Sequence, residues 1–222
     1  MENSDLLNGI TWHLECMALA ASAIDNFHPP ADPFQVRMNY SLYLTNLMSA
    51  IDMVSEIQDS SFETALESSL TTTLSSGAEV LGYMRELRNG VVHRGIDPTS
   101  GGSVVDGVVC AVAPPVVKNR SGNKSYSAPA ALLRDIFFHC EIVSKPIVES
   151  FLEAKFSEVA SITPERAFDD VLNSVETTQH MPDWAKTTAR EQIRPEMLVQ
   201  AKANQIQKLR GLLRPRAGPR IA

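Results

Sequence analysis

The residues whose types and spacing best suit chemistry lie together in residues 88–93, Arg-Asn-Gly-Val-Val-His. An arginine holds a phosphate group through two parallel hydrogen bonds and stays charged at any working pH. Histidine titrates near ~6.5 when unperturbed, so it exchanges protons near neutrality. When the 2′-OH of RNA attacks the adjacent phosphate, the reaction needs a base, an acid and charge stabilisation, and no metal or cofactor. Arg88 and His93 are the residue types that such a reaction requires.

The spacing places these side chains near one another if residues 88–93 are helical. Asn89 and His93 are four residues apart and face the same way. Arg88 lies five residues before His93, about 140° around the helix. Because the arginine side chain is long, we expect Arg88 and His93 to share one edge of the helix, with Asn89 beside them.

A purely structural interpretation of the same residues stays open. His93 at the end of a helix would interact favourably with the helix dipole and with the last carbonyl groups. Arg88 would then form an ion pair inside the protein, with Asp52, Glu56 or Glu86 as its partner. On this interpretation the residues hold a helix end in place and do no chemistry.

Other candidate sites are weaker. His139 lies between Phe138 and Cys140, a setting typical of a core or interface histidine. The three cysteines have no Cys-x-x-Cys spacing, so the sequence predicts neither a zinc site nor a disulfide framework. Gly101-Gly102 lacks the following lysine and helix start of a phosphate-binding loop. We therefore expect no metal and no cofactor.

Long helices must position residues 88–93. Apolar residues recur at three- and four-residue steps in 5–27, 33–58 and 62–93, which predicts three helical regions. The third contains a Thr- and Ser-rich segment that is poor for helix, so we expect it to divide near Gly77. Residues 88–93 then fall in its last turns.

A short β insertion is predicted directly after these helices, at about residues 100–127. Residues 104–113 are β-branched and apolar, typical of a strand or hairpin arm. Val116, Val117 and Tyr126 would form the returning arm. The chain then returns to helix over 128–160, where Pro146 predicts a kink.

The C-terminal part is predicted to hold smaller helices, at 164–178, from about 183, and at 196–213. Residues 214–220 are rich in Arg, Pro and Gly and are expected to be disordered. The sequence thus predicts an all-α bundle with a β insertion over residues 1–160, followed by accessory helices and a basic tail over 161–222.

Charge is distributed unevenly along the chain. The formal net charge is −6. The segment from Lys186 to the end contains nine Lys and Arg and two Glu, a net charge of +7, so the first 185 residues have a net charge of −13. The basic segment would meet nucleic acid, an acidic partner or the protein's own acidic body. No secretory signal and no apolar run of roughly 20 residues is present, so we expect a cytoplasmic protein with no membrane segment.

The motif Arg-Asn-x-x-x-His, at the end of a long helix in an α-bundle, resembles the R-x4–6-H motif of the HEPN (higher eukaryotes and prokaryotes nucleotide-binding) superfamily. A polar residue often follows the arginine in that family, and Asn89 matches it. Residues 37–52 also resemble the long helix that precedes the motif helix. The resemblance covers roughly residues 5–160 and excludes the β insertion and the basic tail.

The resemblance implies an antiparallel helical bundle that forms a homodimer, with two motifs meeting in one cleft. Active members are metal-independent endoribonucleases of toxin–antitoxin, abortive-infection and CRISPR-linked systems, so an antitoxin or a defence-system protein is a possible partner. On this basis Arg88, His93 and Asn89 would be the catalytic residues, and Arg85 and Arg94 would contact RNA. Other members keep the fold without known cleavage, so a non-catalytic dimer that binds nucleic acid, nucleotide or a partner protein is the alternative.

Overall fold

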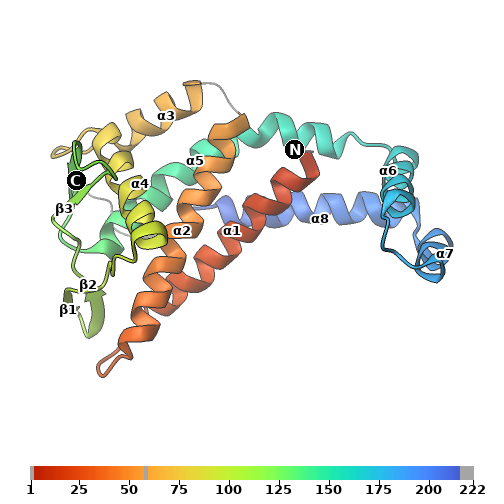
Figure 1. Ribbon diagram of the computed structural model, residues 1–222. Helices are drawn as coiled ribbons and strands as arrows, with labels where there is room; N and C mark the ends of the chain where they lie inside the picture. Colours follow the sequence, from red (N-terminus) through yellow and green to blue (C-terminus); the bar gives the residue numbers. More distant parts are fainter. Residues whose placement is uncertain (1–2, 58–59, 216–222) are drawn as a thin grey trace.

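The computed structural model describes residues 3–57 and 60–215, which form eight helices and two β hairpins (Figure 1). The first four helices are α1 (Asn3–Ile24), α2 (Pro33–Ile57), α3 (Ser60–Leu70) and α4 (Gly77–Arg94). The strands follow as β1 (Gly102–Val105), β2 (Val108–Ala111), β3 (Val116–Lys118) and β4 (Ser125–Ser127). The chain ends with α5 (Leu133–Ala160), α6 (Pro164–Thr177), α7 (Asp183–Gln192) and α8 (Pro195–Leu213). The predicted mostly helical fold with a small β insertion is confirmed.

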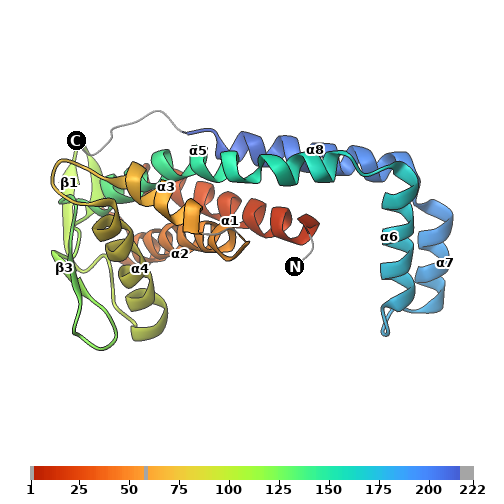
Figure 2. The same ribbon diagram turned by 90° about the horizontal axis from the view of Figure 1, so that it is seen from above.

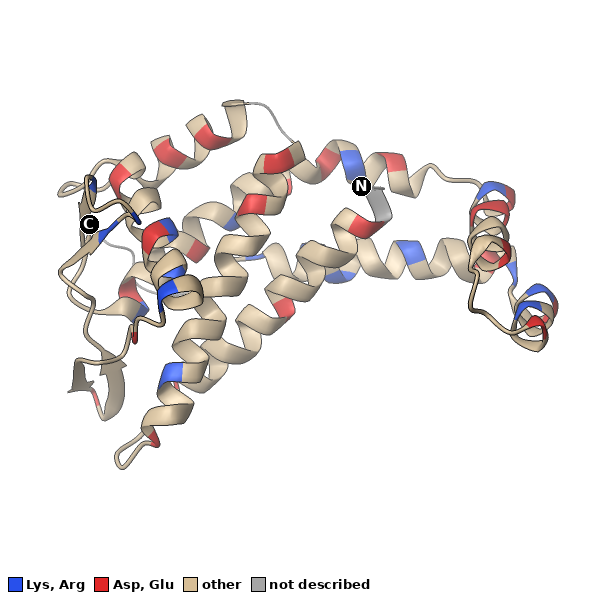
Figure 3. Cartoon of the chain, in the orientation of Figure 1, with Lys and Arg blue, Asp and Glu red and all other residues tan. Residues whose placement is uncertain are grey.

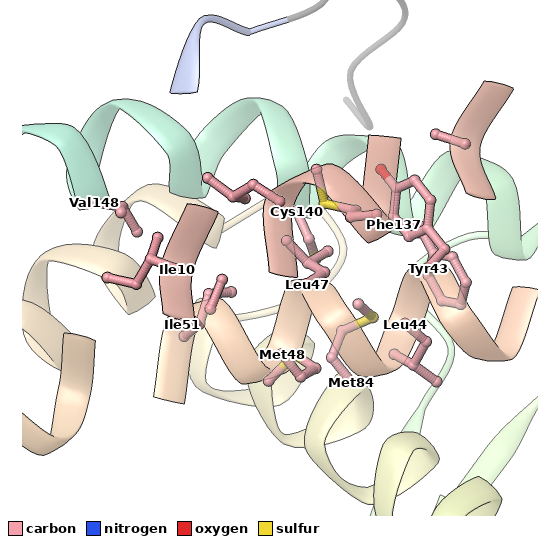
Figure 4. Close-up of a cluster of buried hydrophobic side chains, with 14 of the residues drawn as sticks. Ile10, Tyr43, Leu44, Leu47, Met48, Ile51, Met84, Phe137, Cys140 and Val148 are labelled. Carbon is pink, nitrogen blue, oxygen red and sulfur yellow. The ribbon is translucent and has the colours of Figure 1, made fainter. Parts of the chain in front are cut away.

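One continuous hydrophobic core joins α1, α2, α4 and α5, as Figure 4 shows. The helix α2 lies at its centre because it packs on α1, α4 and α5. Burying one large apolar side chain contributes about 1.5–3 kcal/mol, so this shared cluster is the main source of stability. The side chains labelled in the figure are Ile10, Tyr43, Leu44, Leu47, Met48, Ile51, Met84, Phe137, Cys140 and Val148.

The third helical region divides where the sequence predicts, because α3 ends at Leu70 and α4 begins at Gly77. Ser76 caps α4: its side chain accepts a hydrogen bond from the backbone of Glu79, whose own side chain bonds back to the backbone of Ser76. This reciprocal pair satisfies two of the orphan donors at the helix start. A Cβ atom on Gly77 would lie 1.6 Å from the carbonyl oxygen of Glu67, so only glycine permits this close approach of α4 to α3.

The β insertion consists of two hairpins, whereas the sequence predicts one. Residues 104–113 do not form a single arm, because the chain reverses at Asp106 and Gly107, which have φ angles of 51° and 79°. Positive φ at both central residues is the geometry of a two-residue hairpin turn, for which Asp-Gly is well suited. β1 therefore pairs with β2, and β3 pairs separately with β4.

α5 begins at Leu133 and not at residue 128. The residues before it bond to the β insertion instead. The carbonyl of Ala131 accepts a hydrogen bond from the backbone of Ala113 at 2.8 Å. Leu132 forms an isolated bridge with Val112. The helix then continues past Pro146 to Ala160.

The last three helices divide into an arm and a returning helix. α6 and α7 project from one end of the molecule as a helical hairpin (Figures 1 and 2). α8 returns along α1 and α5 and adds Ile206, Leu209 and Leu213 to the common core. α8 thus shares the bundle core, whereas α6 and α7 contribute no residue to it. Residues 216–220 of the expected disordered tail lie outside the described part of the chain.

The cations of α8 pair with the body of the protein. Lys208 Nζ lies 2.6 Å from Glu15 Oε1, and Arg210 Nη2 lies 2.8 Å from Glu153 Oε2. The sequence allows three partners for the basic segment: nucleic acid, an acidic partner or the protein's own acidic body. Lys208 and Arg210 pair with the acidic body. Within residues 3–57 and 60–215, no helix is both long enough and apolar enough to cross a membrane.

Candidate functional site

The motif residues occupy the last turns of α4, which a glycine terminates. Gly95 has a φ angle of 67°, and its backbone N–H donates to the carbonyl of Gly90. This left-handed cap ends the helix directly after Arg94. His93 is therefore in the final turn and exposed, whereas Arg88 and Asn89 lie further from the end and are half-buried.

Arg88 is held in place by a carboxylate of α2. Its Nη2 lies 2.6 Å from Asp52 Oδ2, with 24% and 29% of the two side chains exposed. Its Nε is buried and has no hydrogen-bond partner in the described part of the protein. The guanidinium thus has a fixed position and an unused donor. Asp52 is one of the three partners that the structural interpretation of the motif allows.

Arg85 lies one turn earlier and belongs to the same charge network. Its Nη1 donates to Glu63 Oε1 of α3 at 2.5 Å, and its Nε lies 3.9 Å from Asp52 Oδ1. Asp52 therefore faces two arginines, and the second of these is also neutralised by Glu63. The predicted RNA contact at Arg85 would have to compete with this ion pair.

Arg94 links the end of α4 to the β insertion. Its Nη1 donates to the carbonyl of Lys118 at 2.8 Å, and its Nη2 donates to the carbonyl of Glu86 at 3.0 Å. The Glu86 carboxylate lies 3.6 Å from Nη2, so Glu86 pairs with Arg94 and not with Arg88. The Arg94 guanidinium is engaged within the protein, which favours a positioning role over a direct RNA contact.

The side chains of His93 and Asn89 have no hydrogen bond or ion pair within residues 3–57 and 60–215. Both belong to a helix whose other motif residue, Arg88, is bound to Asp52. The described chain therefore presents an unengaged imidazole and an anchored guanidinium on the same helix, with no hydrogen bond between them. As a reaction site this arrangement is incomplete, because only one proton-exchanging group is present.

Exposed apolar side chains lie on the same helices. Phe34, Met38 and Leu42 follow one another at four-residue steps along α2. Arg37, in the same turns of α2, donates to the carbonyl of Gly95 at 3.4 Å, so this part of α2 runs beside the end of α4. Val92 next to the motif histidine is also exposed. We refer to Phe34, Met38, Leu42 and Val92 as the apolar stripe.

Two further groups of residues were not predicted from the sequence. A pocket of about 200 Å³ lies between the start of α2 and the β1–β2 hairpin, with Asp97 and Cys110 in its lining. Inside the bundle, Lys145 Nζ lies 2.6 Å from Glu141 Oε1, and Tyr43 donates to the same carboxylate. The pocket lining and the Tyr43–Glu141 contact come from distant segments, so the sequence does not bring them together. Glu141 and Lys145 are four residues apart on one helix, which is the spacing of a local ion pair. His139 is buried, as predicted.

Burial keeps two cysteines protonated. It raises the pKa of the Cys140 thiol to about 12 and also raises the pKa of Cys110. Neither therefore provides a thiolate near neutral pH. In the part of the chain that the structure describes, no three His, Cys, Asp or Glu side chains are grouped as ligands for a metal ion.

Comparisons with family models, with curated proteins and with solved structures found no match to this chain. The likeness to the HEPN superfamily therefore rests on the motif residues and on the helices that carry them.

Proposed function

We propose that this protein is a metal-independent endoribonuclease of HEPN type that acts as a homodimer. The observation that carries the proposal is the arrangement at the end of α4. Arg88 is anchored by Asp52 at 2.6 Å, while His93 on the same helix is exposed and unengaged in the described chain. An arginine that is already fixed loses less conformational freedom when it binds a phosphate. An exposed imidazole is accessible to an RNA strand.

The proposed chemistry assigns a role to each motif residue. His93 exchanges a proton with the 2′-OH nucleophile or with the leaving 5′-oxygen. Arg88 stabilises the charge of the pentavalent phosphate, using donors that Asp52 does not occupy. Asn89 orients the substrate or the histidine.

A dimer would complete the site. One subunit offers a single histidine, whereas the reaction needs both a base and an acid. The apolar stripe supports pairing of two copies near the motif, because exposed apolar surface on a helix is buried favourably against a partner. The second subunit would then contribute the second His93 to a shared cleft.

The proposal is tested by removing each motif side chain and measuring cleavage. We expect His93→Ala and Arg88→Ala each to reduce the cleavage rate of an unstructured RNA at least a hundredfold, because proton transfer and charge stabilisation each contribute about 10²-fold or more. His180→Ala and Arg166→Ala remove the same residue types from exposed positions of the arm and should cleave normally. Wild-type rates in both motif variants, with normal circular dichroism and dimer content, would contradict the proposal.

A second candidate is a dimer that binds nucleic acid, nucleotide or a partner protein without cutting. It is favoured by one observation: Arg88 and Arg85 are each paired with a carboxylate, so the motif carries little free positive charge. This candidate predicts that the protein retains labelled RNA on a filter. The RNA should keep its full length over a range of pH values and in EDTA. The resemblance also suggests an antitoxin or defence-system protein as a partner, which co-expression with neighbouring genes would test.

A further inference from the structure

The β3–β4 hairpin carries concentrated positive charge within the first 185 residues, whose net charge is −13. Residues 107–134 contain four Lys or Arg and no Asp or Glu, although the whole chain has a net charge of −6. Three of these cations, Lys118, Arg120 and Lys124, lie at or near the hairpin tip and are exposed. We call these three the hairpin cations. None of them forms an ion pair within the described part of the chain.

The hairpin cations differ in this respect from the basic side chains that are paired within the protein. Arg88, Lys208 and Arg210 each have a carboxylate within 2.8 Å. A hydrogen bond to Tyr126 is the main cause that raises the pKa of Lys124, and the charge of Glu67 adds a smaller effect. The hairpin cations are thus exposed to an external anion, with Lys124 held beside the Tyr126 ring.

The tip of the hairpin is held by hydrogen bonds within the turn. The backbone of Asn119 donates to the carbonyl of Lys124 at 3.0 Å, and the backbone of Gly122 donates to the carbonyl of Asn119 at 3.0 Å. The Asn119 side-chain amide donates to Asn123 Oδ1 at 2.8 Å, and Ser121 Oγ donates to the same oxygen at 2.6 Å. A turn that is bonded internally in this way holds the backbone that carries the cations, so binding an anion orders side chains but little additional backbone.

Close packing fixes the hairpin against α4. The Tyr126 ring lies on Gly82, where an added Cβ would be 2.1 Å from the ring, and Lys124 Nζ is 5.0 Å from the centre of that ring. Arg94 bonds the carbonyl of Lys118 at 2.8 Å. Because Arg94 directly follows His93, the tip-side end of β3, at Lys118, is attached next to the motif. Figure 3 shows the blue segments of the hairpin beside those of α4.

We propose that the hairpin cations bind the phosphate backbone of a single-stranded RNA and lead it toward the end of α4. This role rests on the proposed function. Cations on a rigid surface that track a backbone are a common way to hold single strands. A single strand is favoured because attack by a 2′-OH requires a nucleotide that is free of the regular geometry of a duplex. Arg94 acts as a positioning residue, since its guanidinium holds the hairpin in place.

The test compares two sets of three charge removals. One variant carries Lys118→Gln, Arg120→Gln and Lys124→Gln. The matched control carries Arg166→Gln, Arg194→Gln and Lys202→Gln, which remove three cations that have no ion pair in the described chain and lie in or next to the α6–α7 arm. Both are made with His93→Ala so that RNA stays intact. Fluorescence anisotropy then gives the Kd of a labelled, unstructured RNA at several salt concentrations.

Each phosphate contact on a single strand adds about 0.7 to the slope of log Kd against log salt, so the hairpin variant should lose about 2 from that slope. Its Kd at 50 mM salt should rise about tenfold or more, while the control stays within about twofold of the parent. Equal slopes and Kd values for the hairpin variant and the control would overturn the inference. Failure of the parent protein to bind RNA at all would overturn it too.

Cleavage measurements with His93 intact separate this inference from the proposed function. If RNA binding depends on the hairpin cations but the protein never cleaves RNA, the inference is supported and the proposed endoribonuclease function is contradicted. If the hairpin variant cleaves RNA with the KM of the wild-type protein, the proposed endoribonuclease function is supported and the inference is contradicted. Vesicles containing phosphatidylserine provide the last comparison: loss of vesicle binding alone, with RNA binding unchanged, would assign the hairpin cations to a membrane surface and overturn the inference.

Discussion

Asp52 connects the motif to the bundle, because it is the only residue of α2 that pairs with both Arg88 and Arg85 in the described structure. The pair with Arg88 is about a quarter exposed on each side, so solvent screens it and its contribution to stability is small, on the order of 1 kcal/mol or less. Its larger effect is geometric, since it fixes where the Arg88 guanidinium lies.

We therefore predict that Asp52→Asn affects activity more than stability. Loss of the charge releases Arg88, so kcat for RNA cleavage should fall about tenfold or more, in line with the sensitivity of rates to small misplacements. The melting temperature should fall only slightly. Glu56→Gln, at an exposed position one turn further along α2, is the control and should change neither quantity. A faster enzyme after Asp52→Asn would mean that Asp52 restrains Arg88 instead of positioning it.

Asp97 makes the free energy of unfolding depend on pH. Burial acts to raise its pKa, but hydrogen bonds from the Thr99 hydroxyl and backbone, together with Arg37, outweigh burial and lower the pKa. A carboxyl whose folded pKa is depressed stabilises the protein above its unfolded pKa of about 3.9, and that contribution disappears as the pH falls through the folded pKa. Urea unfolding between pH 6 and pH 2 should show a smaller acid-induced loss for Asp97→Asn than for wild type.

At the scale of elements, the start of α4 decides where the motif helix lies. Gly77→Ala should lower the free energy of unfolding by about 2 kcal/mol or more, because the new Cβ would meet the Glu67 carbonyl and separate α3 from α4. Gly211→Ala is the control: nothing lies within 4 Å of its Cβ position in α8, so the change should stabilise by up to about 1 kcal/mol. Denaturant melts measure both, and a neutral Gly77→Ala would contradict this account.

Helix periodicity made most elements predictable, and tertiary pairing explains the errors. The sequence predicts the break near Gly77 because Thr and Ser residues interrupt an apolar pattern. It does not reveal that residues 131 and 132 pair with residues 113 and 112 after β2, so α5 is predicted to start too early. It names three possible partners for Arg88 but cannot choose among them, because Asp52 is 36 residues away and only packing of α2 on α4 brings it near.

At the scale of the whole molecule, the bundle and the arm differ in how they are stabilised. α7 has no buried residue, and α6 has only Ala167. α6 packs on α8 and α7, whereas the bundle helices share one core. The arm therefore depends on few tertiary contacts, and short helices with few such contacts are marginally stable in water.

We predict that hydrogen exchange separates these two parts. Backbone amides of α7 should exchange first, because local opening there exposes almost no apolar surface. Amides of α2 should exchange last, near the rate set by global unfolding, because α2 packs on α1, α4 and α5. Equal protection of α7 and α2 would show that a partner or a second copy covers the arm.

The turn between α6 and α7 also makes the arm useful for engineering. Residues 176–180 are all exposed, and the turn lies far from α4 in both views of the chain (Figures 1 and 2). Exposed turns with few backbone contacts accept inserted sequence most readily. A fluorescent protein or an epitope tag placed between Gln179 and His180 should leave folding and RNA binding intact, which would allow the protein to be followed in living cells without blocking either end of the chain.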